Sequence, residues 1–371
     1  MPHRRTILIA DGKPNTVPDV TVVMGELGYE VVAVSNALFQ AMAVRYKPRA
    51  IVFGTGLPAG GPVSVLRRLR ASVHTASIPA IALVANEEEK LTLLSAGADE
   101  CMQEPASAAD LLVTLRKHLA TPRIVASASD EVLSDPDRLS ALGNTKLMDT
   151  DPDDALDVLT RLAARILDAP VAVVSLVDDR RQFFKSQVGL PHPWDKLRET
   201  PVSGSFCQWV VSGKEELVIS DARSHPVLKM NSAITELGTV AYAGAPLSAV
   251  MGQSIGSFCV VDGKPRSWDE DQMTALRHLG EMVDAHVSLY TPIKQELSAE
   301  AHEQQVRAAT RAACRGFLAA ARLLSSDHLP ITNNDRREIV GMIEVHSHRL
   351  SKITTEQSAV QEKALAAGWA T

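Results

Sequence analysis

The first 120 residues alternate short apolar runs with segments of helical spacing, and this alternation restricts the fold more than any other feature. The runs at 7–10, 50–53 and 78–84 are rich in Ile and Val and too short for helices, which is typical of buried strands. Between them, segments such as 87–96 have helical spacing. Strands that alternate with helices indicate a parallel sheet covered by helices, with its functional residues at the carboxyl ends of the strands.

Residues 130–290 follow a different order of elements. Helical patterns at 152–167 and 270–289 flank strand patterns that follow one another without intervening helices, among them 254–262. This order favours an antiparallel sheet flanked by helices, an α+β layer fold. A stretch rich in Pro, Ala and Ser at 121–129 separates the two regions and has the composition of a linker.

Residues 295–362 have the clearest helical periodicity in the chain. Apolar or small residues recur from 306 to 324 in steps of four and three, and the pattern resumes from 339 to 360 after a loop. Asn334 or Asp335 is expected to cap the second helix, because either side chain can accept hydrogen bonds from free N–H groups. The pattern predicts a helical hairpin with one apolar stripe on each helix.

Two antiparallel helices cannot bury both of these stripes by themselves. We therefore expect two hairpins to pair into a four-helix bundle, so that the protein is a homodimer through its C-terminal helices. His346 is polar and falls on the stripe, where such a residue is expected to fix the register of the helices. The residues expected in the dimer interface are Phe317, Leu324, Ile339, Ile343, His346, Leu350 and Ile353.

The composition predicts a cytoplasmic protein that binds neither nucleic acid nor membranes. A formal charge of −6 gives no general attraction to nucleic acid or anionic lipid. No apolar run approaches the roughly 18–20 residues that span a bilayer. The apolar stretch near the start of the sequence is too short for a signal peptide. The cysteines form no Cys-x-x-Cys pair, so we expect no metal site, no cofactor and no disulfide framework. The four thiols are expected as small buried hydrophobes, at Cys101, Cys207, Cys259 and Cys314.

Over residues 5–120 the order and spacing of the elements resemble the receiver domains of two-component signalling. The segments 97–99, Gly-Ala-Asp, and 104–105, Glu-Pro, stand where that family has Gly-Ala-Asp and Lys-Pro. The resemblance implies a doubly wound, flavodoxin-like α/β domain.

The chain departs from this family at the positions that carry phosphoryl chemistry. Receivers have a phosphoacceptor aspartate at the end of the third strand, where this chain has Gly54. Val84 replaces a Thr or Ser that bonds the phosphoryl oxygen, and Glu104 replaces a Lys that neutralises its charge. Of the acidic pair that holds magnesium, only Asp11 remains. The resemblance therefore implies a pseudo-receiver that is not phosphorylated and serves as a protein-interaction surface.

Residues 130–290 resemble the GAF family of sensory domains. The resemblance is carried by the segments 174–178, 181–186 and 205–207, and by 256–262 followed by Pro-Arg. It implies an antiparallel sheet with a space for a small molecule beneath a covering loop and helix. The candidate lining residues are Phe206, Cys207, Trp209, Asn231 and Tyr242, with simple core packing as the alternative. The ligand stays open, and a covalently attached bilin is not expected, because 224–229 contains a His without an adjacent Cys.

Residues 300–358 resemble the dimerisation and phosphotransfer hairpin of histidine kinases, most closely over 335–353. Matching the helix ends places Ala308 at the phosphohistidine position, and alanine has no nitrogen to phosphorylate. His302 and Glu303 have the order of the reactive pair but lie six residues too early. Because only 18 residues follow Ile353, we expect no ATP-binding kinase domain and no autophosphorylation.

Together the resemblances imply three domains: a pseudo-receiver at 5–120, a GAF domain at 130–290 and a kinase-type hairpin at 295–362. The function expected is that of a non-catalytic adaptor in a bacterial two-component phosphorelay, which binds a sensor kinase or a response regulator. Two alternatives stay open. One is a histidine phosphotransferase that relays phosphate through His302, and the other is a small-molecule sensor that uses the GAF pocket.

Overall fold

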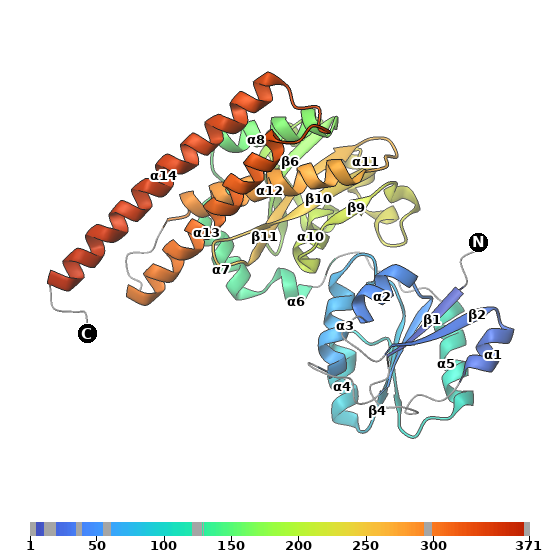
Figure 1. The fold of residues 1–371 in the computed structure, drawn as a ribbon. Coiled ribbons are helices and arrows are strands. Elements are labelled where there is room, and N and C mark those ends of the chain that lie inside the picture. The colour runs from blue at the N-terminus through green and yellow to red at the C-terminus, as the bar shows by residue number, and fades with distance from the viewer. Residues whose placement is uncertain are drawn as a thin grey trace. The chain divides into compact units, whose positions relative to one another are not determined.

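The computed structural model describes residues 5–10, 20–34, 39–54, 61–120, 128, 130–292 and 299–366. The chain divides into two compact units, Met1–Ser129 and Asp130–Thr371 (Figure 1). The helical hairpin therefore belongs to the same unit as the antiparallel sheet.

The first unit is a five-stranded parallel sheet with the strand order β2-β1-β3-β4-β5. This is the flavodoxin-like order of doubly wound folds, so the predicted fold class of this region is confirmed. Its strands are β1 (Arg5–Ala10), β2 (Tyr29–Val34), β3 (Ala50–Phe53), β4 (Ala80–Val84) and β5 (Glu100–Gln103). Its helices are α1 (Thr21–Glu26), α2 (Phe39–Tyr46), α3 (Gly61–Ala71), α4 (Glu87–Ser95) and α5 (Ala108–Ala120).

Helices cover both faces of this sheet, and each face has its own apolar core. Side chains of α2, α3 and α4 pack on one face, whereas those of α1 and α5 pack on the other. An ion pair of 2.8 Å between Arg70 of α3 and Asp99 ties α3 to the start of β5. Asp99 also accepts a hydrogen bond from the N–H of Ala80. The Gly-Ala-Asp segment therefore has a structural role that does not depend on phosphoryl chemistry.

The second unit contains a six-stranded antiparallel sheet with the order β8-β7-β6-β11-β10-β9. The predicted α+β layer fold is thereby confirmed. The strands are β6 (Val171–Val177), β7 (Arg181–Val188), β8 (Glu199–Pro201), β9 (Leu217–Ile219), β10 (Ala241–Ser248) and β11 (Ser254–Asp262). The shorter helices are α6 (Asp130–Leu133), α7 (Pro136–Thr145), α9 (Trp194–Leu197), α10 (Cys207–Gly213) and α11 (Ala233–Glu236), with 3₁₀ turns at Val202–Gly204, Ala222–Ser224 and Leu228–Met230.

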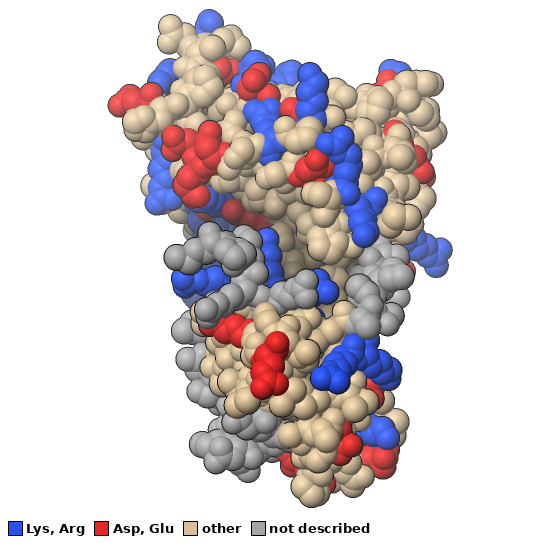
Figure 2. Space-filling model, turned by 90° about the vertical axis from the view of Figure 1, so that its right-hand side faces the viewer, with Lys and Arg blue, Asp and Glu red and all other residues tan. Residues whose placement is uncertain are grey.

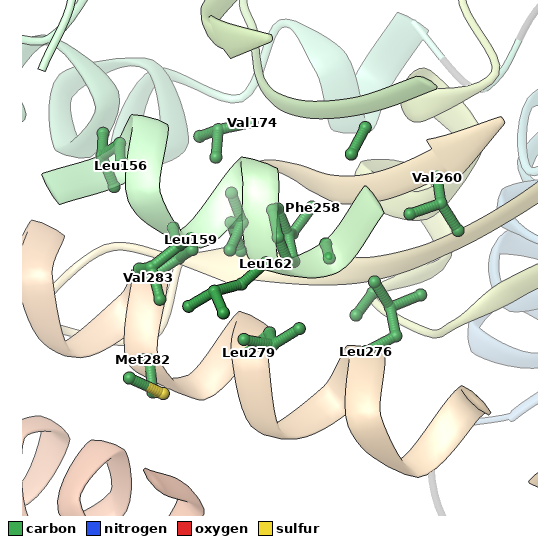
Figure 3. Packing of buried hydrophobic residues seen from close by; sticks show 14 of the residues in the cluster. Leu156, Leu159, Leu162, Val174, Phe258, Val260, Leu276, Leu279, Met282 and Val283 are labelled. Atoms are coloured by element: carbon green, nitrogen blue, oxygen red, sulfur yellow. The ribbon is translucent and has the colours of Figure 1, made fainter. Parts of the chain in front are cut away.

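Helices α8 (Asp154–Ile166) and α12 (Glu270–Tyr290) pack side by side on one face of this sheet. Figure 3 shows leucines of both helices packed beside Phe258 and Val260 of β11. Successive residues of a strand point to opposite faces, so Ser257 and Cys259 point away from this core. The other face of the sheet therefore carries Ser257 and Cys259, and α10 packs on it.

The C-terminal hairpin, α13 (Ala299–Leu324) and α14 (Asn333–Ala366), packs on α12, and α14 also contacts α8. Ala320 and Leu323 of α13 and Ile339 and Met342 of α14 belong to the apolar core that α8 and α12 form over the sheet. The hairpin is therefore a further layer of the second unit.

Thr332 begins α14 through a reciprocal capping arrangement. Its hydroxyl accepts a hydrogen bond from the N–H of Asp335, and the Asp335 carboxylate accepts bonds from the N–H and hydroxyl of Thr332. The N-cap is thus Thr332, whereas the sequence pattern had suggested Asn334 or Asp335. Asp335 is 1% exposed and also accepts hydrogen bonds from Arg165 of α8, which anchors the start of α14 to the GAF-type layer.

We expect Gly316→Ala to destabilise the protein by about 1–2 kcal/mol, because a Cβ at Gly316 would lie 2.5 Å from the Cβ of Ala285 in α12. Gly341→Ala is the matched control in α14. A Cβ there meets nothing within 4 Å, so the higher helix propensity of alanine should stabilise the protein by about 0.5–1 kcal/mol. Urea unfolding of both variants measures the difference, and stabilisation by both would contradict close packing of α13 on α12.

Candidate functional site

The receiver-type positions lie together at the carboxyl ends of β3, β4 and β5. Gly54 follows β3, and its N–H donates to the carbonyl of Ala10 at 2.8 Å. Val84 ends β4 and is buried, and its carbonyl accepts a 2.9 Å hydrogen bond from the N–H of Glu104. Asp11 lies outside the described residues. The three described positions thus present a bare backbone, an apolar side chain and a carboxylate.

This set of side chains is unsuited to phosphoryl transfer. Gly54 has no side-chain atom to accept a phosphoryl group, and the methyl groups of Val84 cannot hydrogen-bond one. The negative charge of Glu104 would repel a phosphate, where a cation would attract it. The surrounding sheet is regular, with β3, β4 and β5 paired in register. At these three described positions the strands are regularly paired, whereas the side chains differ from those of the receiver family.

A narrow pocket with a cavity volume of about 30 Å³ lies on the face of the GAF-type sheet opposite α8 and α12. The structure places Phe206, Cys207 and Tyr242 in its lining, as the sequence pattern proposed. Trp209 is buried but lies outside the lining. Asn231 instead holds a loop, because its amide donates to the carbonyl of Ser203 and its oxygen accepts from the N–H of Ala233.

A row of buried polar side chains crosses the sheet beside this pocket. The hydroxyls of Tyr242 and Ser257 are 3.0 Å apart, and the Gln182 amide donates to Thr200 at 2.6 Å. The Gln182 oxygen accepts from Ser175 and from Ser205. These buried side chains hydrogen-bond to one another, so the polar groups beside the pocket are held in fixed positions. In the sequence, this row is indicated by single polar residues within the apolar runs of β6 and β11.

Two thiols meet in the same pocket. The sulfur atoms of Cys207, the first residue of α10, and Cys259, in the middle of β11, are 3.9 Å apart. Neither forms a disulfide, and both side chains line the pocket. Their separation of 52 residues in the chain hid this pair from sequence motifs, which register only neighbouring cysteines.

The candidate phosphotransfer residues of the hairpin lie in different surroundings. Ala308 is buried and lines a surface pocket together with Arg311 and Arg315. The Glu303 carboxylate pairs with Arg307, one turn along α13. The carboxylate that would activate the imidazole of His302 is therefore engaged by a guanidinium group.

The stripe assigned to a dimer interface is covered within a single chain. Ile339 is in the core shared with α8 and α12, and Leu324 and Ile343 pack against that core. Ile353 clusters with Leu289 of α12, and Phe317 and Leu350 pack around them. The expectation that the hairpin needs a second copy to bury its stripes is wrong, because α12 of the same chain covers them. The homodimer itself stays a prediction.

His346, the polar residue of the stripe, joins a chain of side chains from three helices. Its Nε2 lies 3.4 Å from Nδ1 of His286 in α12, and Nε2 of His286 lies 3.2 Å from the carboxylate of Asp153, the N-cap of α8. Burial, reinforced by repulsion from His286, lowers the pKa of His346 to about 4. Burial opposes ionisation of Asp153, but the hydrogen bond and charge of His286 prevail and lower its pKa to about 2.

Residues 151–287 match the family model of the GAF domain. The chain is 30% identical over 143 residues to a cyclic di-GMP phosphodiesterase of Pseudomonas aeruginosa, a match that covers 38% of this chain and 24% of that protein. It is 31% identical over 147 residues to the DNA-binding dual master transcriptional regulator RpaA of Synechocystis, covering 37% of this chain and 61% of the relative. The chain thus spans less than two thirds of either relative.

Among solved structures, the receiver domain of a sensor histidine kinase from Pseudomonas aeruginosa is 27% identical, with a TM-score of 0.27. That match covers 32% of this chain and 98% of the domain. The chain thus joins a parallel sheet of the flavodoxin-like strand order to a second region that matches the GAF family. Its central part, over residues 151–287, is a GAF domain.

In the described parts of the chain, every helix is too short or too polar to cross a membrane. Figure 2 shows basic and acidic side chains on the same face, among many uncharged ones. That face therefore carries charges of both signs.

Proposed function

We propose that the protein is a non-catalytic regulator of a bacterial two-component phosphorelay, which binds a sensor kinase or a response regulator through its receiver-type unit and its hairpin. One observation carries the proposal: Gly54, Val84 and Glu104 replace the phosphoryl chemistry at the edge of an otherwise regular sheet. Such a sheet keeps the shape of a receiver while phosphate passes only between its partners.

The GAF domain would bias this contact through β11 and α12. Cys259 of β11 faces the pocket, and its neighbours Phe258 and Val260 face α8 and α12. A ligand that shifts β11 would press on α12, against which α13 packs. The hairpin would thereby carry the state of the pocket to a bound partner, and we propose that it does so as a homodimer.

A binding assay with the full chain tests this proposal. The fluorescently labelled protein is titrated with the cytoplasmic parts of sensor kinases and with response regulators from the same organism, and anisotropy is recorded. We expect saturable binding to at least one of them, and a changed rate of phosphoryl transfer between that partner and its cognate protein. Absence of any complex, with unchanged transfer rates throughout, would refute the adaptor role.

A second candidate function, small-molecule sensing, is favoured by the buried polar row beside the pocket. The lining combines aromatic rings with the hydroxyl of Tyr242, which lies 3.0 Å from the hydroxyl of Ser257, and this suits a small ligand with an apolar body and one polar end. Native mass spectrometry and thermal shifts against a metabolite panel test it. A retained ligand would support sensing, whereas an unliganded protein with no shift across the panel would count against it.

A further inference from the structure

We propose that Cys207 and Cys259 form a reversible disulfide when a peroxide enters the GAF pocket. The two sulfur atoms face each other at 3.9 Å, and a disulfide requires them to approach to about 2.05 Å. One thiol belongs to the first residue of a short helix and the other to a central strand, so the approach needs a small movement of α10 toward β11. The inference concerns this pocket alone and holds whether or not the chain binds a kinase.

The pocket supplies a polar partner for one of the sulfurs. The hydroxyl of Tyr242 donates a hydrogen bond to the sulfur of Cys207 at 3.4 Å. The phenol reaches this position by lying across Gly244, where the Cβ of any other residue would come within 2.4 Å of the phenol oxygen. The strand thus leaves room for a ring whose hydroxyl is directed at the thiol.

The two thiols are unequal, as a reacting pair requires. The hydrogen bond from Cys259 lowers the pKa of Cys207 to about 7; burial opposes this, and the hydroxyl of Tyr242 adds to it. The pKa of Cys259 is raised, first by the same hydrogen bond and then by burial. Cys207 is therefore the nucleophile and Cys259 the resolving thiol, because the thiolate is the reactive form.

The reaction balances with hydrogen peroxide as the oxidant. The Cys207 thiolate attacks one peroxide oxygen and the O–O bond breaks, which leaves a sulfenic acid and a hydroxide that takes up a proton to become water. The Cys259 sulfur then attacks the sulfenic sulfur, the S–S bond forms, and the departing hydroxyl leaves as a second water with the proton of Cys259. Two thiols are oxidised by two electrons, and one peroxide is reduced to two waters.

The other two cysteines provide internal controls. Cys101 lies in the first unit, where burial raises the pKa of its thiol to about 11. Cys314 is exposed on α13. If solvent exposure alone decided which thiol is oxidised, Cys314 would react first. Selective oxidation of Cys207 and Cys259 would therefore show that their local environment decides.

The test uses the reduced full-length protein treated with hydrogen peroxide in stoichiometric amount. Remaining thiols are alkylated in denaturant, and peptides are mapped without reduction. We expect a peptide pair joined through Cys207 and Cys259, a loss of two of the four free thiols, and recovery of both with dithiothreitol. Alkylation of both Cys207 and Cys259 after a treatment that oxidises Cys314 would overturn the proposal, as would irreversible oxidation of Cys207 without a joined peptide.

The variant Cys259→Ser tests the assigned roles, with Cys314→Ser as the matched control. Without its resolving thiol, Cys207 should stop at the sulfenic acid and be trapped by dimedone, whereas Cys314→Ser should still form the disulfide. A peroxide-treated Cys259→Ser protein that carries no dimedone on Cys207 would contradict the mechanism. Should that variant fail to fold, the peptide map of the wild-type protein decides the proposal by itself.

Discussion

Ile339→Ala should lower the free energy of unfolding of the GAF-containing unit by about 3 kcal/mol, although Ile339 lies in the C-terminal hairpin. Its side chain is 0% exposed and belongs to the core that α8 and α12 form over the sheet. Truncation to alanine removes buried methyl and methylene groups and leaves a cavity among those helices. Val340→Ala is the matched control, because that neighbour is 43% exposed and its truncation should change stability by less than about 0.5 kcal/mol.

Urea unfolding followed by tryptophan fluorescence measures this loss of stability in the GAF domain. Three of the four tryptophans, Trp194, Trp209 and Trp268, lie in the GAF domain, so most of the signal reports the sheet and its helices. We expect a lower midpoint of this transition for Ile339→Ala and an unchanged one for Val340→Ala. An unaltered GAF transition in both variants, with a separate hairpin transition, would show instead that the hairpin folds independently.

Acidification from pH 7 to pH 4 should cost the second unit up to about 3 kcal/mol through His346 alone. Burial and the neighbouring His286 lower the pKa of His346 to about 4, below its ordinary value of 6.5. The unfolded chain therefore binds this proton more readily than the folded one between these two values. The stability contributed by neutral His346 is complete above pH 6.5 and is lost as the pH falls toward 4.

The groups that face His346 from the neighbouring helices are His286 of α12 and, beyond it, Asp153 of α8. The pKa of Asp153 is lowered to about 2 from 3.8, so its own contribution is lost only below about pH 4. Thermal unfolding from pH 7 to pH 4 should show a much shallower decline in His346→Gln than in the wild type. His348→Gln, an exposed histidine on the same helix, should keep the wild-type slope, and equal slopes in all three proteins would contradict the assignment.

The sequence was most informative where a pattern repeats locally. Alternating Ile- and Val-rich runs predicted the parallel sheet, and the spacing from 306 to 360 predicted two helices, because both patterns depend on backbone period alone. The spacing of apolar residues shows which face of a helix is buried, but it does not show which surface covers that face. The stripe through Ile339 and His346 therefore suggested a second chain, whereas α12 of the same chain covers it.

Some residues of the candidate sites could likewise be located from the local sequence, whereas others are brought together only by the fold. Gly54, Val84 and Glu104 could be located from sequence, since each directly follows or ends a recognisable strand. Cys259 could not be placed beside Cys207, because their contact depends on α10 folding back over the sheet. Ser257 could not be placed beside Tyr242, because that contact depends on the pairing of β10 with β11. The chain from His346 to Asp153 likewise joins three helices that are distant in sequence.

Labelling with phosphate shows whether this receiver-type regulator carries a phosphoryl group. The full chain is incubated with a sensor kinase and its response regulator in the presence of radiolabelled ATP and magnesium, and the label on each protein is followed over time. We expect the chain to alter the label on the kinase or the regulator and to acquire none itself. Acid-labile label on the chain that disappears in His302→Ala would establish phosphotransfer through His302 and contradict the account, as would label retained on the receiver-type unit.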